Sequence, residues 1–67
     1  MKKKIVEYVR KHPRCRLREI GGGLKVWHIH LVKDVHDLVD AGVLTVEHHH
    51  DAANLEFYDL YSIRKKN

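Results

Sequence analysis

The chain has 67 residues, a formal net charge of +4 and a single cysteine. This length allows one small domain with a marginal core, and the single cysteine excludes an internal disulfide and favours a reducing, cytoplasmic setting. No apolar run approaches the roughly 20 residues of a membrane span, and the charged MKKK start is not followed by the apolar stretch of a signal peptide.

The positive charge is distributed unevenly along the chain. Residues 1–25 contain nine lysines and arginines against two acidic residues, whereas residues 26–63 contain one lysine against seven acidic residues. Three more basic residues begin at position 64. The basic first third and the basic C-terminal end favour a polyanionic partner, but the acidic central part does not.

The segment KKKIVEYVRKH, residues 2–12, predicts an amphipathic helix, because apolar residues recur there at spacings of three and four. These apolar residues are Ile5, Val6 and Val9. Pro13 ends the helix, since the residue before a proline avoids helical backbone angles. Residues 14–16 are too few for a helix, and we expect an isolated extended strand there with Cys15 turned inward.

The stretch LREIGGGL, residues 17–24, predicts a second helix that contains three consecutive glycines. Each glycine in a helix interior costs about 1 kcal/mol relative to alanine, so we expect this helix to be short or frayed. A phosphate-binding loop is not supported, because no Gly-Lys-Ser/Thr sequence follows the glycines. The remaining alternative is that the glycines let the backbone approach a DNA phosphate or a second subunit closely.

The clearest helix is predicted from His28 to Ala41, and Gly42 follows it as a glycine stop. Its apolar stripe repeats at helical spacing and consists of Leu31, Val35 and Leu38, widened by Val32 and Val39. The opposite face carries Ile29, His30, Lys33, His36, Asp37 and Asp40.

Two runs of alternating polar and apolar residues follow, and together they predict a β-hairpin. The first run spans residues 44–50, the stretch DAAN at 51–54 predicts the turn, and the second run follows directly. The predicted order is therefore helix, short strand, helix, helix and hairpin. This order defines a single α+β domain over residues 1–67, with basic ends at 1–4 and 64–67.

Three segments of the chain resemble the winged helix-turn-helix family of small bacterial and archaeal transcription regulators. They are LREI with the following L.V, then V..LVDAGVL, then LEFYDLYSI. The spacing from Arg18 to Leu44 fits the family pattern without a gap, and the resemblance covers nearly the whole chain. It implies three helices, a short strand and a C-terminal hairpin called the wing, with the third helix in the major groove of DNA.

The resemblance also implies sequence-specific binding of double-stranded DNA by a transcription regulator. The family's base-facing positions fall on His28, Ile29, His30 and Lys33. Val32 matches a further contact position, but its helical angle places it near the core stripe. Ile29 suits a thymine methyl group, and Lys33 suits guanine or phosphate. The phosphate-facing set, extended by the basic first third of the chain, is Lys2, Lys3, Lys4, Arg14, Arg16, Arg18 and Lys25.

The sequence departs from the family pattern at several positions. The family usually has alanine after the position of Ile20, where two helices cross, and Gly21 meets that need, whereas Gly22 and Gly23 have no such reason. The turn position holds Lys25 instead of glycine, at a cost of about 1 kcal/mol for left-handed backbone.

A further departure is Trp27, which stands where a serine or threonine would cap the third helix. Its ring has three interpretations: it packs over the turn, it anchors a protein partner or a second copy of the chain, or it stacks on a nucleic acid.

The predicted reading face also carries acidic residues. Asp34 and Asp37 follow His30 and Lys33 by four residues, the spacing at which side chains pair on a helix. Such pairs would partly neutralise the face. The alternative function is therefore a winged-helix protein-interaction module with weak or no DNA binding. Candidate contacts with a partner, or with a second copy in a homodimer, are Trp27, Leu55, Phe57 and Tyr61.

Seven of the 67 residues are histidines, and three of them stand together in the predicted hairpin. His48 and His50 share a strand face, which is half of a zinc or nickel site, but solvent-exposed histidines explain the pattern more simply. We therefore expect no metal and no cofactor. Histidine is the side chain whose charge changes near physiological pH, so a DNA contact of a histidine-rich wing would depend on pH. No catalytic arrangement is evident, so neither an enzyme nor a small-molecule substrate is expected.

Overall fold

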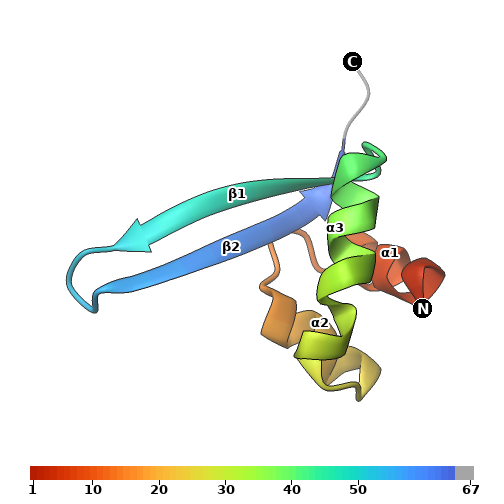
Figure 1. Cartoon of the computed structure of the whole chain (residues 1–67), viewed down its shortest axis with the longest axis horizontal. Helices are drawn as coiled ribbons and strands as arrows, with labels where there is room; N and C mark the ends of the chain where they lie inside the picture. Colours follow the sequence, from red (N-terminus) through yellow and green to blue (C-terminus); the bar gives the residue numbers. More distant parts are fainter. Residues whose placement is uncertain (65–67) are drawn as a thin grey trace.

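The computed structural model describes residues 1–64 and has three α-helices followed by a long antiparallel hairpin (Figure 1). The elements are α1 Lys2–Lys11, α2 Leu17–Leu24, the short 3-10 helix η1 His28–Leu31, α3 Val32–Asp40, β1 Leu44–Asp51 and β2 Glu56–Ile63. The predicted α+β class and element order are present, and they are compatible with a winged helix. Beyond Arg64, the predicted basic end lies outside the described residues.

A very short strand joins the hairpin to the helices. The Cys15 N–H donates to the Tyr61 carbonyl at 3.1 Å, and the Tyr61 N–H donates to the Cys15 carbonyl at 2.8 Å. β2 therefore lies between Cys15 and β1, and the register of the hairpin pairs Leu44 with Ile63. The predicted isolated strand is confirmed, and the Cys15 side chain is buried.

The core lies where the three helices meet the base of the hairpin. It consists of Ile5, Val9, Cys15, Ile20, Leu31, Val35, Leu38, Leu44 and Tyr61. Each helix contributes residues of its predicted apolar stripe to this core. Burial of these side chains stabilises the helices, which are too short to be stable alone. No helix within residues 1–64 is long and apolar enough to cross a membrane.

The base of the hairpin is buried, and its far end projects away from the helices (Figure 1). Tyr61 near the base is 6% exposed, whereas Leu55 and Phe57 at the far end are 82% and 81% exposed. The prediction that Tyr61 contacts a partner is therefore wrong. Alternation puts Phe57 and Tyr61 on one sheet face, but only the base of that face reaches the core.

The turn of the hairpin lies one residue later than predicted. Asp51 is still paired, with Glu56, and the turn residues extend to Leu55. A carboxylate oxygen of Asp51 accepts hydrogen bonds from the backbone N–H groups of Ala53 and Asn54, at 3.1 and 3.4 Å. An aspartate that bonds the backbone two residues on is typical of turns.

The predicted third helix is divided in two. Its first turn, His28–Leu31, is a 3-10 helix, and regular α-helix begins at Val32. Trp27 precedes this turn and has no side-chain oxygen that could accept a bond from the first amides, so a tighter 3-10 turn there is understandable.

The end of α3 follows the prediction. Gly42 has a φ of 77°, the Gly42 N–H donates to the Val39 carbonyl at 3.0 Å, and the Val43 N–H donates to the Leu38 carbonyl at 2.9 Å. These two bonds form a Schellman motif, in which a left-handed glycine closes the helix.

α2 is short, as expected, and ends at Lys25 in the left-handed conformation, with φ 58° and ψ 40°. The Val26 N–H donates to the Gly21 carbonyl at 2.9 Å, so Lys25 occupies the place of the usual glycine. A Cβ atom on Gly21 would lie 2.7 Å from the Val26 carbonyl oxygen. The close packing predicted at Gly21 is therefore present.

The other two glycines of α2 differ from each other. A Cβ on Gly22 would meet no atom of residues 1–64 within 4 Å, so Gly22 has no packing reason, as predicted. A Cβ on Gly23 would collide with the ring of Tyr8. The prediction that Gly23 lacks a packing reason is wrong, because its neighbour comes from α1, fifteen residues earlier in the chain.

Candidate nucleic-acid interface

The four predicted base-reading residues lie on η1 and the first turn of α3. Ile29 is 56% exposed, His30 and Lys33 are exposed, and His28 is half-buried. Val32 is 38% exposed, so its predicted place near the core stripe is wrong. Val32 is the first residue of α3 and lies at the side of the line formed by Val35 and Leu38, and it is not among the residues packed on the core.

Four exposed residues thus follow one another at i, i+3, i+4 and i+7 on the outer side of this helical segment. We call this surface the reading stripe, and it consists of Ile29, Val32, Lys33 and His36. Two of its members are apolar and one carries a permanent positive charge.

The predicted pairing of acids with the reading face is not observed. Asp37 instead forms an ion pair with Lys2 on α1, and its Oδ2 atom lies 3.3 Å from Lys2 Nζ. Among residues 1–64, Lys33 forms no ion pair, and Asp34 forms none with His30. The positive charge of Lys33 therefore remains available to a ligand. The negative charge of Asp37 is partly offset by Lys2 on α1.

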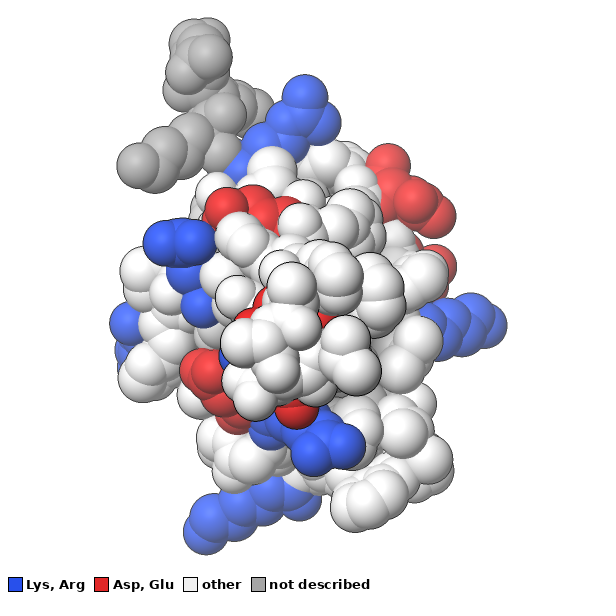
Figure 2. All heavy atoms as spheres, turned by 90° about the vertical axis from the view of Figure 1, so that its left-hand side faces the viewer, with Lys and Arg blue, Asp and Glu red and all other residues white. Residues whose placement is uncertain are grey.

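Two of the predicted phosphate-binding residues form ion pairs within the protein. Arg14 donates through Nε to Glu47 at 3.2 Å, and Lys2 is bonded to Asp37. Both positive charges are therefore partly offset by a neighbouring carboxylate. Seen from the end of the hairpin, basic and acidic side chains are interspersed (Figure 2).

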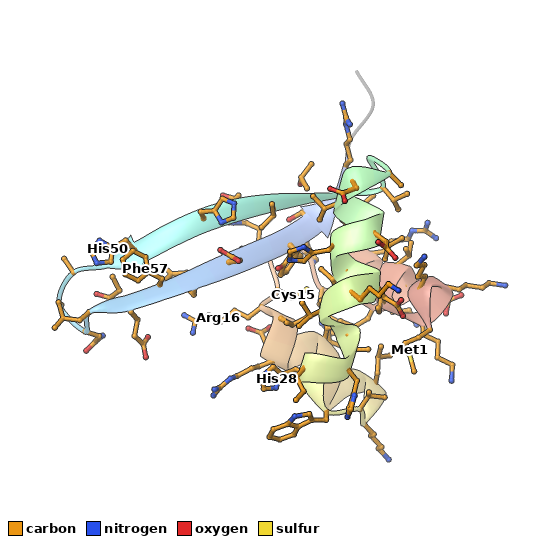
Figure 3. The ribbon with its side chains drawn as sticks, viewed as in Figure 1. Met1, Cys15, Arg16, His28, His50 and Phe57 are labelled. Atoms are coloured by element: carbon orange, nitrogen blue, oxygen red, sulfur yellow. The ribbon has the colours of Figure 1, made fainter. Side chains whose placement is uncertain are left out.

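Arg16 and Arg18 lie at the start of α2, beside the outer edge of β2. The Arg16 guanidinium carbon is 4.2 Å from the centre of the Tyr58 ring, and both arginines line a shallow groove of about 300 Å³ with residues 56–59. Figure 3 shows Arg16 extending from the start of α2 toward the hairpin side of the molecule. Arg16 and Arg18, together with Lys25 at the other end of α2, bracket this helix with positive charge.

Trp27 does not pack over the turn as its first interpretation supposed. Its side chain is 62% exposed, and its main aromatic neighbour is His28, with the ring centres 5.2 Å apart. The other two interpretations, an anchor for a protein and a stacking contact with a nucleic acid, both remain consistent with this position.

The far end of the hairpin is apolar and acidic rather than basic. The rings of His50 and Phe57 stack with their centres 4.4 Å apart (Figure 3), and Leu55 is exposed beside them. Hydrogen bonds from the Asn54 side chain and backbone lower the pKa of Asp51. The segment from His48 to Phe57 has no lysine or arginine, so it is unlike the basic wing tip that would hold phosphate.

The hairpin histidines do not gather into a metal centre. His48 Nδ1 lies 2.7 Å from Asp59 Oδ1 across the strands, and His50 stacks on Phe57 instead of turning toward His48. In the part of the chain that the structure describes, no three metal-binding side chains converge. The backbone of Cys15 pairs with that of Tyr61 at the base of the hairpin.

The thiol of Cys15 is buried and has low reactivity. Burial, and then the negative charge of Glu19, raise the pKa of its thiol to about 11. The thiolate is the reactive form of cysteine, so this residue serves the core.

Comparison with known proteins adds no relative: no family model, no curated protein and no solved structure matches this chain. The class of the molecule therefore rests on its own architecture, which is an α+β domain of three helices and a hairpin.

Sequence reasoning missed two features of the candidate interface. Val32 is exposed because no element of the described chain packs on its side of α3, and the sequence carries no local signal of that. The ion pair between Lys2 and Asp37 cannot be read from the local sequence, because only the packing of α1 on α3 brings the two residues together.

Proposed function

We propose that this chain is a winged-helix protein that binds double-stranded DNA sequence-specifically and acts as a transcription regulator. The observation that carries the proposal is the reading stripe, where Lys33 is exposed and unpaired within residues 1–64 while Asp37 is held by Lys2. The left-handed turn at Lys25 and the tight crossing at Gly21 support a helix-turn-helix. The position of β2 between β1 and Cys15 supports a wing.

In this proposal η1 and the start of α3 enter the major groove, where Ile29 and His30 face the base edges and Lys33 contacts the adjoining phosphate. The start of α2 crosses the backbone. Arg16 precedes α2 and has no acceptor atom, so the first amides of the helix are free of a side-chain cap and can donate to a phosphate. Arg18 and Lys25 add charge at the two ends of the same helix.

A second candidate is a protein-interaction module, and the far end of the hairpin favours it. Leu55 and Phe57 are the two most exposed large apolar residues of the described chain, and Asp51 and Glu56 beside them would repel phosphate. Exposed aromatic residues of this kind are enriched in protein interfaces.

Salt dependence separates the two functions. Four phosphate contacts, from Arg16, Arg18, Lys25 and Lys33, give a slope of about −3.6 in log affinity against log salt. We expect fluorescence anisotropy on a mixed-sequence duplex to record a loss of affinity of about 100-fold between about 50 and 200 mM salt. Absence of binding even at the lower concentration contradicts the DNA proposal and favours the protein-interaction module.

Variants then test which residues are responsible. Lys33→Ala is expected to reduce the slope by about 0.9 and, combined with His30→Ala, to remove the preference for a selected site. Lys11→Ala is the matched control, because Lys11 is an exposed lysine at the end of α1, outside the predicted contact set. If the combined variant retains the site preference, α3 is not the reading element.

A further inference from the structure

The beginning of the reading stripe is apolar. Ile29 and Val32 are 56% and 38% exposed, and they stand three residues apart, so they are neighbours on the helix surface. Neither belongs to the hydrophobic core or to the partly buried residues packed on it. Two branched apolar side chains therefore face solvent where a recognition helix would meet the bases.

The major groove offers one apolar group, which is the methyl group on C5 of thymine. 5-Methylcytosine presents a methyl group at the same ring position. Ile29 and Val32 have no donor or acceptor, so a methyl group is what they can recognise on a base edge. The reading stripe has no arginine, asparagine or glutamine, which are the residues that make paired hydrogen bonds to guanine or adenine.

We propose that Ile29 and Val32 recognise the C5-methyl group of pyrimidines in the major groove. The inference rests on the proposed DNA binding and names the chemical group that is read. Lys33 follows Ile29 by four residues, so the two side chains are neighbours on the helix surface, and Lys33 is exposed and unpaired within residues 1–64. A free cation beside an apolar pair complements a methyl group next to phosphate, and this favours DNA over an apolar protein surface.

The test uses two pairs of duplexes that differ only in this methyl group. One pair has alternating A·T with either thymine or uracil, and the other has alternating G·C with either cytosine or 5-methylcytosine. Burial of one methyl group corresponds to about 0.8 kcal/mol, or about fourfold in affinity. We expect anisotropy to record about 15-fold tighter binding for each methylated duplex if both side chains are engaged.

The two pairs also distinguish the sources of the methyl group. A preference in both pairs means that the group itself is read. A preference in the A·T pair alone means that thymine is the ligand, and one in the G·C pair alone means that 5-methylcytosine is the ligand. Each of these three results supports the inference.

Two variants assign the effect to the residues. The double variant Ile29→Ala and Val32→Ala is expected to lower the methyl preference to about twofold or less, because the contacting carbons are removed. Both residues are exposed, so the fold is expected to survive, as circular dichroism will check. Lys33→Ala is the matched control, and it should weaken binding to all four duplexes while keeping the preference.

Three results overturn the inference. Salt-dependent binding with equal affinity within both pairs rejects methyl recognition and leaves the proposed DNA binding intact. A complete lack of binding to all four duplexes at low salt rejects both. A lower molar mass of the double variant than of the natural chain in analytical ultracentrifugation means that Ile29 and Val32 contact a second copy of the protein.

Discussion

The ring of Tyr8 on α1 lies over Gly23 on α2, so that a Cβ atom on Gly23 would fall only 2.7 Å from the Cδ2 and Cζ atoms of the ring. The two glycines before it have different surroundings. Gly21 faces the backbone at Val26, and Gly22 faces open space among the described residues. Three identical neighbours therefore predict three different responses to substitution.

We expect Gly22→Ala to stabilise the protein and Gly21→Ala to destabilise it. At Gly22 the added methyl meets open space, and alanine gains about 1 kcal/mol of helix propensity over glycine. At Gly21 the methyl must displace backbone, which costs about 1–3 kcal/mol. Equilibrium unfolding in urea measures both changes, and equal shifts in the same direction would contradict the assignment.

Gly23→Ala is expected to depend on Tyr8. In the natural chain the ring must leave its place over α2, and the lost packing offsets the propensity gain. In a Tyr8→Ala background the ring is absent, so the same substitution should stabilise by about 1 kcal/mol. A double-mutant cycle measures the coupling, and a coupling near zero would show that the ring does not rest on Gly23.

Lys25→Gly is expected to raise stability and weaken DNA binding at once. Lys25 has a φ of 58°, which costs about 1 kcal/mol for a residue with a side chain and little for glycine. The same substitution removes one proposed phosphate contact, so the log-salt slope should fall by about 0.9. Urea unfolding and anisotropy are the two measurements, and an unchanged slope removes Lys25 from the phosphate set.

Lys2→Ala is expected to weaken DNA binding although Lys2 forms an ion pair with Asp37. Its removal releases the negative charge of Asp37 next to the reading stripe, at a cost to folding below about 1 kcal/mol because both side chains are about half exposed. Lys3→Ala is the matched control, since Lys3 is an exposed neighbour without an ion pair in residues 1–64. Equal effects of the two variants would mean that both lysines act only through bulk charge.

The same pair provides a second arm. Asp37→Asn removes the negative charge, so it should strengthen DNA binding and abolish the difference between Lys2→Ala and Lys3→Ala. Anisotropy at about 50 mM salt suits this comparison, because screening is weaker there. Weaker binding by Asp37→Asn would mean that Asp37 itself contacts the ligand.

Cys15 is expected to resist thiol reagents until the protein unfolds. Burial and Glu19 raise its pKa from 9.0 to about 11, so the folded state holds the thiol proton more tightly than the unfolded state. The resulting stability is fully present below pH 9 and is lost as the pH rises toward 11. Labelling kinetics with and without urea test the shielding.

The pH effect of Cys15 is isolated by substitution. Between pH 9 and 11, the stability of a Cys15→Ala variant should decline less steeply than that of the natural chain. Tyr61 also has a pKa raised by burial and by Asp59, and it contributes equally to both proteins. Parallel declines would contradict a buried thiol.

Local sequence patterns predicted much of the fold because their causes are local. Pro13 marks the end of α1, Gly42 closes α3, and the left-handed turn at Lys25 follows the spacing of the resembled family. The hairpin turn was misplaced by one residue, since the Asp51 carboxylate bonds the turn backbone while Asp51 itself still pairs with Glu56.

The candidate interface was predictable in its residues but not in their surroundings. Ile29, His30 and Lys33 are exposed, as the helical pattern indicated, whereas His28 is half-buried. Val32 is also exposed, because no element within residues 1–64 packs on its side of α3. Tyr61 was a candidate contact together with Leu55 and Phe57, and the alternation of the strand does not tell which end of their shared sheet face is covered.

By itself, then, the sequence determined the order of the helices and strands and the uneven charge, because helix and strand patterns depend on neighbours within a few residues and charge depends on composition alone. Only the tertiary structure decided that Tyr8 covers Gly23, that Lys2 holds Asp37 and that Tyr61 is buried. These relationships join residues far apart in the chain, and side chains of that separation meet only when the helices and the hairpin pack.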